Sequence, residues 1–577
     1  MVEGCEMYRS NEDIARRVYR ALKTPTDNSP RTDPILAFHF KGKEDYIMLR
    51  CNKSPELSIK GKDQTAGEVK FFAYSDFSDF TEADVLLKLR AAILLAELYR
   101  KGASDAQSFK AWAESARWLE TLRPAISASG AAAERLERVA AGHGVVITAG
   151  QQPGLFGGPG YTWLKAMTAI ALAERFEHVT GIPAVPIFWA ATDDADFDEA
   201  SFTTVAIGAE CRRVSIERQG DEGLVMAQMP LGNVTPAVEA FLEATRSAPH
   251  RAVVDAVQQA YHGDATVGNA YVQLLRHVLE PLGMPVIDAW HPAVRGAARP
   301  VLVAALRGAA KIDEAVSMRS VTIERAGYRA QVARVSRLSL VFRSTVGIKE
   351  RAPLSQAGDA ARRDDLVLSA NVLLRPIVER RILPTIAYVG GPGEVAYFAQ
   401  VGAVAEAMGV PMPLIVPRWS ATVVEPAVDR MLGRLGMMID DIRAPHRAER
   451  RIGERAMAPA VRDALAALQS GLDAQLTAVA DASRAVELSS PEVIEGARRQ
   501  LKQRIERLER RLRAAATKSE ADAVRDVAAI RATLLPEGER QDRRLNYVPF
   551  FARYGDPLIS RLKDGAALHA TALIGAR

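Results

Sequence analysis

The hydrophobic pattern changes character along the chain, and its middle part is typical of an α/β protein. Between residues 145 and 416, short apolar runs of strand length alternate with helical stretches. The runs are Val145–Thr148, Ala184–Trp189, Pro285–Asp288, Thr385–Val389 and Pro413–Val416. Such alternation predicts parallel strands joined by crossover helices. We therefore expect a doubly wound parallel sheet.

Two blocks interrupt this alternation. Residues 201–230 and 320–349 are rich in β-branched residues, alternate between apolar and polar, and lack long helical patterns. These features favour small antiparallel insertions at the margin of the sheet.

After about residue 426 the strand pattern stops and helical spacing takes over. Apolar residues recur in steps of three and four, which is coiled-coil spacing. The first set is Val461, Leu465, Leu468, Leu472, Leu476 and Val479, and the second is Ile494, Ala497, Leu501, Ile505, Leu508 and Leu512. Pro491 separates the two sets, and Pro536 should end the second. The pattern predicts an antiparallel helical hairpin whose second helix is continuous over residues 491–534.

The predicted organisation has four parts. Residues 1–80 form an N-terminal segment of unknown role, with a candidate strand pair around Ile35–Arg50. Residues 81–430 form the α/β core, which begins with a helix after Thr81. Residues 431–540 form the coiled-coil hairpin. Residues 541–577 carry aromatic side chains that should pack back on the core.

Composition narrows the class of protein. The 577 residues are 48% hydrophobic and 25% charged, as in an ordinary globular protein. Three cysteines without a CxxC pair exclude a disulfide framework and a cysteine-rich metal site. No apolar run approaches the roughly 18 residues needed to cross a bilayer. We expect a soluble cytoplasmic protein without a membrane partner.

The positive charge is concentrated in the helical part. The chain has a net charge of +5, and residues 443–545 alone contain 21 basic and 16 acidic residues. Within them, residues 498–513 hold eight basic and two acidic residues. A solvated face of a coiled coil is favoured over nucleic-acid contact, because no aromatic residues are interleaved for base stacking.

The first candidate for chemistry is the glycine-rich connection Thr148–Lys165. Its glycines allow close backbone approach, and the N-terminus of the following helix favours an anion. It is neither a Walker loop nor a dinucleotide fingerprint. The alternative is a tight turn without a ligand. The candidate residues for binding substrate or nucleotide are Gly150, Gln151, Gln152, Gly154, Gly157, Gly158, Tyr161 and Lys165.

The second candidate is the acidic run after the second strand, with Asp193, Asp194 and Asp196 as the chosen catalytic residues. Carboxylates at a strand's carboxyl end could hold Mg²⁺, bind a substrate amine or act as a base. The alternative is helix capping by a solvated loop. The sequence does not decide whether a metal binds.

A third loop follows the fourth strand, and it supplies the remaining binding candidates. These are Gly390, Gly391, Gly393, Glu394, Tyr397 and Gln400. Ligands in open α/β sheets bind at the carboxyl edge near a switch in strand order. We therefore expect the three loops to meet at one site. No GxSxG, HExxH or local Cys–His pattern supports a hydrolase triad or a zinc site.

Three blocks carry a resemblance to a known family. They are VVITAGQQPGLFGGPGYTWLKAMTAI, PIFWAATDDADFDE and LLRPIVERRILPTIAYVGGPGEVAYFAQVGAVAEAMGVPMPLIVPR. Together they resemble the bacillithiol synthase family, the cysteine ligases of bacillithiol biosynthesis, over about residues 140–577. The resemblance implies a Rossmann-type core and a helical coiled coil used in homodimerisation.

The resemblance also implies the reaction, in which cysteine is joined to the amine of glucosaminyl-malate in the last step of bacillithiol synthesis. Forming an amide requires an activated carboxyl group, and ATP with Mg²⁺ is the activator expected from the chemistry. Neither the HIGH nor the KMSKS signature of class I aminoacyl-tRNA synthetases appears. Two alternatives remain open. One is a non-catalytic scaffold whose basic coiled coil binds a partner or nucleic acid and whose Rossmann core only senses a small ligand, and the other is a nucleotidyltransferase that stops at the adenylate.

Overall fold

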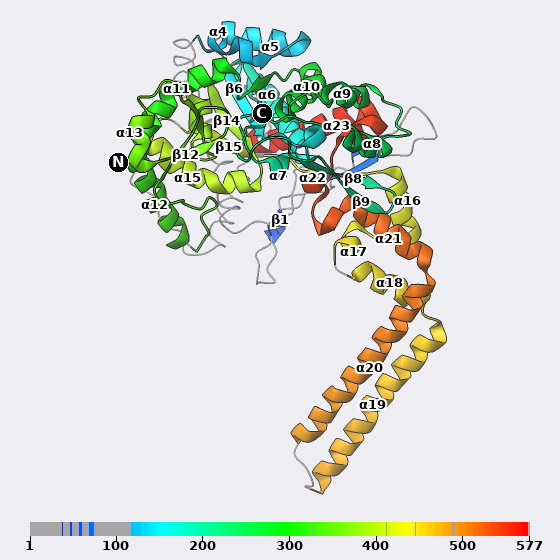
Figure 1. The fold of residues 1–577 in the computed structure, drawn as a ribbon. Helices are drawn as coiled ribbons and strands as arrows, with labels where there is room; N and C mark the ends of the chain where they lie inside the picture. Colours follow the sequence, from blue (N-terminus) through cyan, green and yellow to red (C-terminus); the bar gives the residue numbers. More distant parts are fainter. Residues whose placement is uncertain are drawn as a thin grey trace, which may run out of the picture.

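The computed structural model describes residues 117–574, apart from residues 143, 326, 411, 445 and 487–490, together with four short strands between residues 37 and 73. Its centre is a six-stranded sheet with the order β15-β14-β6-β7-β10-β5 (Figure 1). The strands are β5 (Ile126–Ser127), β6 (Val145–Gln151), β7 (Ala184–Ala190), β10 (Val286–Asp288), β14 (Thr385–Gly390) and β15 (Leu414–Pro417). All neighbours are parallel except β10 and β5. The five strands predicted from apolar runs are confirmed.

Helices cover both faces of this sheet, so its strands are buried on both sides. On β7, Phe188 enters one hydrophobic core and Trp189 the other. The first core is built by α6 (Tyr161–Thr180), α8 (Thr235–Glu243), α9 (Ala252–Ala260), α10 (Val267–Leu279) and α23 (Val548–Ile574). The second is built by α4 (Trp118–Leu122), α5 (Gly130–Ala141), α11 (Pro292–Arg307), α12 (Ala309–Arg325), α13 (Ala357–Ala360), α14 (Arg375–Ile382) and α15 (Pro392–Met408). Burial on both faces explains why the strands read as unbroken apolar runs.

The first predicted insertion is an antiparallel hairpin of β8 (Phe202–Ile207) and β9 (Glu210–Ser215). The second differs from the prediction. Its strands are β11 (Leu338–Ser344), β12 (Glu350–Pro353) and β13 (Val367–Ala370), in the order β12-β11-β13. Residues 320–325 instead continue α12, whose earlier residues Ala309, Ile312 and Val316 pack in the second core, so β-branched composition alone does not decide the local structure.

The N-terminal segment contributes strands. β1 (Ala37–Phe38) pairs antiparallel with β2 (Ile47–Met48), inside the range where a strand pair is predicted. β4 (Val69–Ala73) pairs with β3 (Leu57–Ile59) and with β16 (Ala421–Val424), the strand that follows β15 in the chain. The predicted helix after Thr81 lies outside the described residues.

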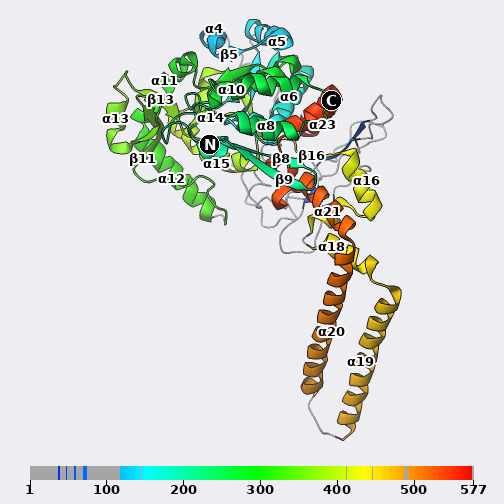
Figure 2. The ribbon, with the colours of Figure 1, turned by 45° about the vertical axis from the view of Figure 1, so that its right-hand side comes forward.

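The helical hairpin projects from the globular part of the molecule (Figures 1 and 2). It consists of α19 (Pro459–Ala485) and α20 (Pro491–Ser519). A small third core at its base is formed by α16 (Pro426–Leu435), α17 (Ile439–Arg443), α18 (Arg447–Ala456) and α21 (Ala521–Leu534).

The prediction of one helix over residues 491–534 is wrong. Glu520 has non-helical angles (φ −99°, ψ 52°) and separates α20 from α21. The reason lies in burial: α20 is mostly exposed, whereas α21 buries Val527, Ile530 and Leu534 in the third core. The chain must change direction at Glu520 for both to hold. The apolar spacing in the sequence does not show that the chain passes from the exposed α20 to the third core at Glu520.

The C-terminal segment packs in the first core, as its aromatic residues predict. After α22 (Gln541–Arg544), Tyr547, Phe550 and Phe551 are almost completely buried, and the Phe551 ring meets Trp163 of α6 edge-on at 5.5 Å. Within the described part of the chain, no helix combines the length and apolar character needed to span a membrane.

Candidate active site

The site lies where the strand order of the sheet reverses. From β6 the chain moves to β7 and β10 on one side, and later to β14 and β15 on the other. The carboxyl ends of β6 and β14 therefore flank the switch point, where open α/β sheets bind ligands. The three loops singled out in the sequence follow β6, β7 and β14.

Lys165 ties the first of these loops to the third. It projects from the apolar helix α6 and only 3% of its side chain is exposed. Its Nζ donates to the carbonyl of Gly150 and to Oε1 of Gln151, both at 2.9 Å, and pairs with the carboxylate of Glu394. Burial lowers the pKa of Lys165, and Glu394 opposes that effect. A buried ammonium needs such partners.

Glu394 is the centre of the third loop. It caps its own helix, α15, by accepting from the N–H of Gly391 at 2.7 Å, and it accepts from the hydroxyl of Tyr388 at 2.7 Å. Arg375 of α14 donates to the same hydroxyl at 2.8 Å. Burial would raise the pKa of Glu394, but Lys165 and Arg375 hold it below its usual value.

Tyr161 extends the network to the second loop. Gln151 donates to its hydroxyl at 3.4 Å, and that hydroxyl donates to Glu199 at 3.3 Å. Glu199 belongs to α7 (Phe197–Ala200), the short helix that follows the acidic run. The three predicted loops are thus joined by hydrogen bonds and ion pairs.

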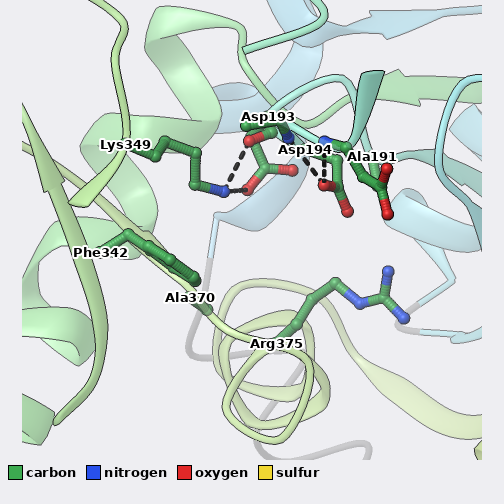
Figure 3. Close-up of a pocket in the computed structure, with 9 residues that line it drawn as sticks. Ala191, Asp193, Asp194, Phe342, Lys349, Ala370 and Arg375 are labelled. Carbon is green, nitrogen blue, oxygen red and sulfur yellow. Dashed lines mark hydrogen bonds and ion pairs between the residues drawn. The ribbon is translucent and has the colours of Figure 1, made fainter. Parts of the chain in front are cut away.

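The acidic run holds its shape through its own backbone. Asp194 Oδ1 accepts from the N–H groups of Ala195 at 2.7 Å and Asp196 at 3.0 Å. Asp196 caps α7 by accepting from the N–H of Glu199 at 3.1 Å. These contacts are the capping role weighed in the sequence. They fix the loop, and Figure 3 shows the other oxygen of Asp194 turned toward the side where Arg375 lies.

Asp193 is held by a lysine from the second insertion. Lys349 Nζ donates to the carbonyl of Asp193 at 2.6 Å and lies 3.7 Å from its carboxylate. Burial raises the pKa of Asp193, and the charge of Lys349 opposes the rise.

A cavity of about 210 Å³ opens at this edge of the sheet (Figure 3). The lining residues are Ala191, Asp193, Asp194, Ala195, Asp196, Phe342, Lys349, Ala370 and Arg375. Of the predicted site residues, only the three aspartates line it. Gly150, Gln151, Tyr161, Lys165 and Glu394 form the polar network described above, which reaches the cavity through Arg375.

The glycines of the first loop pack inside the protein. Gly157 and Gly158 have φ angles of 88° and 72°, and Gly157 N donates to Tyr261 at 3.3 Å. Asn546 of the C-terminal segment donates to a carbonyl of this loop at 2.8 Å. A Cβ on Gly154 would come within 2.7 Å of Gly158. Close packing accounts for these glycines without a ligand. Gln152, which follows β6, is half-buried.

Most residues of the third loop also have internal partners. The carbonyl of Gly390 accepts from the N–H of Arg418 at 2.8 Å. Gln400 is buried and accepts from the N–H of Val332 at 3.0 Å, which anchors a loop before β11. Tyr397 is buried beside Phe398. The cavity lining does not include Gly390, Gly391, Gly393, Glu394, Tyr397 or Gln400.

Sequence reasoning missed the cationic and apolar side of the cavity. Lys349 ends the block interpreted as a marginal insertion, and Phe342 lies within it, so this insertion forms a wall of the site. Arg375 lies in the block that carries the family resemblance, next to Pro376 at the start of α14. A basic residue in an otherwise apolar run was the available signal. Among the residues that the structure describes, no group of three or more His, Cys, Asp or Glu could hold a metal ion.

Glu379 pairs with Arg375 outside the cavity lining, and its burial leads to a prediction about pH. Its carboxylate is 3.5 Å from Arg375 Nε, and 1% of its side chain is exposed. Burial raises its pKa from 4.5 to about 7, although Arg375 opposes the rise. In the wild type, the contribution of protonated Glu379 to the free energy of unfolding is fully present below pH 4.5. It is lost as pH rises through 7, because the buried carboxyl must then ionise.

Glu379→Gln should therefore gain stability relative to the wild type as pH rises, on the order of 3 kcal/mol between pH 4.5 and 8. Urea unfolding at several pH values measures this difference. The same substitution at the exposed Glu406 of α15 is the control and should show no such trend. A difference between wild type and Glu379→Gln that stays constant with pH would contradict the assignment.

The fold and the site define a class of protein: an α/β protein with a Rossmann-like core, polar residues gathered at its switch point, and a helical coiled-coil arm. The chain belongs to the bacillithiol biosynthesis BshC family. The model of that family's N-terminal Rossmann-like domain matches residues 95–419, and the model of its C-terminal coiled-coil domain matches residues 421–571. The resemblance found in the sequence is confirmed.

Similar curated proteins share most of their length with this chain. A protein of Solibacter usitatus named "Putative cysteine ligase BshC" is 30% identical, over 76% of this chain and 85% of the relative. Proteins with the same name from Symbiobacterium thermophilum and Koribacter versatilis are each 29% identical, over 78% of this chain and 87% and 86% of their own lengths.

Proposed function

We propose that this protein is a ligase that joins the carboxyl group of cysteine to the amine of glucosaminyl-malate. The observation that carries the proposal is the cavity at the switch point, where carboxylates of the β7 loop face Arg375. The names of the relatives support cysteine as a substrate. A non-catalytic scaffold would have no need for Asp193 and Asp194 to line a cavity opposite Arg375.

The chemistry assigns separate tasks to the aspartates. The carboxyl group of cysteine must first be activated by attachment of a leaving group. The sugar amine then attacks the acyl carbon, so that a C–N bond forms, the bond to the leaving group breaks, and the amine loses a proton. We assign Asp193 as the acceptor of this proton, because burial brings its pKa closer to working pH. Asp194 then remains available to hold the cationic amine of cysteine.

ATP with Mg²⁺ is our proposal for the activating co-substrate, and it rests on the chemistry of the carboxyl group. The glycine loops add no support, because Gly157, Gly158 and Gly160 donate their N–H groups within the protein. At the start of α15, the carboxylate of Glu394 already occupies the capping position.

A mass-spectrometric assay of the purified full chain tests the proposal. Cysteine and glucosaminyl-malate are supplied with and without ATP and Mg²⁺, and each substrate is omitted in turn. The proposal expects product only when both substrates are present, and it expects product formation to require ATP. Product formed without ATP would exclude ATP as the co-substrate but would still support the ligase function. Absence of product under all conditions would overturn the function.

We also propose a homodimer through the helical hairpin. The two helices of one chain cover each other only in part: Leu468 and Val479 of α19 are 49% and 51% exposed, and Leu501 and Leu508 of α20 are 39% and 44% exposed. The structure describes no buried residue in α19. Apolar stripes of this length normally pack against another surface, and a second hairpin offers a matching one.

Replacing both Leu501 and Leu508 with Glu should therefore lower the mass measured by light scattering from dimer to monomer, because a charged residue in the stripe must be desolvated on association. Circular dichroism should show that the core remains folded. Gln503→Glu on the exposed face of the same helix is the control and should leave the dimer intact. A wild-type monomer of 62.7 kDa at micromolar concentration would contradict the proposal.

A further inference from the structure

The cavity is lined by charged side chains of both signs, with more carboxylates than cations. Of its two cations, Lys349 is already matched with Asp193 through the carbonyl and the carboxylate. This leaves Arg375 on one side and the carboxylates of Asp194 and Asp196 on the other. In Figure 3 Arg375 extends beneath the acidic run, and no ion pair closes the space between them.

The guanidinium of Arg375 is held by residues that do not line the cavity. It donates to the Tyr388 hydroxyl at 2.8 Å, and the carboxylates of Glu379 and Glu394 lie 3.5 and 3.9 Å from it. Of its side chain, 17% is exposed, and it lines the cavity. A guanidinium anchored in this way is oriented before a ligand arrives, and it suits a carboxylate because it can donate two parallel hydrogen bonds.

A third side of the cavity is apolar. Phe342 of β11 and Ala370 of β13 line it, on the side away from the acidic run. Lys349 Nζ lies 4.6 Å from the centre of the Phe342 ring, which fixes the aromatic side chain beside the charged residues. Sulfur atoms make favourable contacts with aromatic rings.

We propose that this cavity is the subsite for the amino acid and that it binds a zwitterion. This inference rests on the proposed function, because that function supplies cysteine as the substrate. Asp194 receives the ammonium group, Arg375 receives the α-carboxylate, and the side chain lies against Phe342. Three different contacts around one tetrahedral carbon also imply discrimination between the two enantiomers.

Size and charge both argue against the sugar substrate as the occupant. The volume of about 210 Å³ is below the roughly 300–1,000 Å³ of pockets that enclose drug-sized ligands. The malate portion of glucosaminyl-malate carries two carboxylates, whereas both cations of the cavity already lie beside carboxylates of the protein, Lys349 beside Asp193 and Arg375 beside Glu379 and Glu394. A dicarboxylate would face uncompensated repulsion from Asp194 and Asp196.

Calorimetric titration of the wild-type full chain tests the proposal, with and without glucosaminyl-malate present. The ligands are L-cysteine, D-cysteine, cysteamine, which lacks the carboxylate, and 3-mercaptopropionate, which lacks the amine. L-cysteine should bind about 10- to 100-fold more tightly than either analogue, because each analogue leaves one charged partner unpaired. L-malate should not displace it.

Two variants locate the contacts. Asp194→Asn should weaken the binding of L-cysteine by about 100-fold and leave the binding of 3-mercaptopropionate unchanged. Arg375→Gln should weaken the binding of L-cysteine and leave the binding of cysteamine unchanged. Asp198→Asn, at a side chain that is 94% exposed, and Arg381→Gln, on the exposed face of α14, are the matched controls. Because the analogues act on the wild type, the test does not depend on the folding of Arg375→Gln.

The outcomes separate this inference from the ligase proposal. If product forms but L-cysteine does not bind, binds no better than its analogues, or is displaced by L-malate, the subsite assignment is overturned and the ligase stands. If L-cysteine binds with the expected pattern and no product forms, the zwitterion site is supported and the ligase is overturned.

Discussion

Asp194→Asn is expected to lower kcat/KM for cysteine by about 100-fold or more while the protein stays folded. The substitution preserves the shape of the side chain, and the amide oxygen can still accept from the N–H groups of Ala195 and Asp196. It removes the negative charge that faces the cavity. Removing the charged partner of an ammonium group in a partly desolvated site costs about 2–5 kcal/mol, which corresponds to this loss.

Comparison with Asp193 separates the two tasks. Asp194→Asn should act mainly through KM for cysteine, whereas Asp193→Asn should act mainly through kcat and remove the acidic limb of the pH profile. Asp198→Asn should have close to wild-type kinetics, because that side chain is 94% exposed and pairs only at the surface. A kcat/KM for cysteine within about threefold of the wild type in Asp194→Asn would leave this residue with its capping contacts alone.

Lys165→Met is expected to destabilise the protein by about 3 kcal/mol. It leaves the Glu394 carboxylate, whose side chain is only 17% exposed, without its closest cation, and breaking one side of a buried ion pair is costly. Arg375, at 3.9 Å from Glu394, compensates only in part. Urea unfolding measures the change.

A double variant distinguishes lost charge from lost packing. Adding Glu394→Gln to Lys165→Met should recover part of the stability, because the unpaired carboxylate is removed. As a control, Lys563→Met disrupts a pair with Glu174 whose side chains are 34% and 48% exposed, and it should cost less than about 1 kcal/mol. A loss below 1 kcal/mol in Lys165→Met itself would show that the pair does not hold the loops together.

The sheet was predictable because burial on both faces leaves an unbroken apolar run in the sequence, as in β7. Glu520 shows the limit of this reasoning. The apolar spacing continues through it, and only the change from an exposed arm to the third core interrupts the helix. A periodic pattern reports that a face is apolar, but not which partner covers it.

The acidic half of the site was predictable for a related reason. Asp194 lies in the loop that follows the buried strand β7, so its position at the sheet edge follows from local sequence. Lys349 and Arg375 reach the same cavity from the second insertion and from α14, and only tertiary packing brings them there. The glycine signal was ambiguous, since close packing, as at Gly157, and ligand approach require the same residue.

Isotope-labelled substrate shows whether the protein forms an amide between cysteine and the sugar amine. Glucosaminyl-malate carrying ¹⁵N at the sugar amine is incubated with cysteine, ATP, Mg²⁺ and the full chain, and the product is fragmented in the mass spectrometer. We expect a cysteinyl group attached through the ¹⁵N atom as an amide, with a free thiol that an alkylating reagent can cap. A product joined through sulfur, or no new species with the wild-type protein, would contradict it.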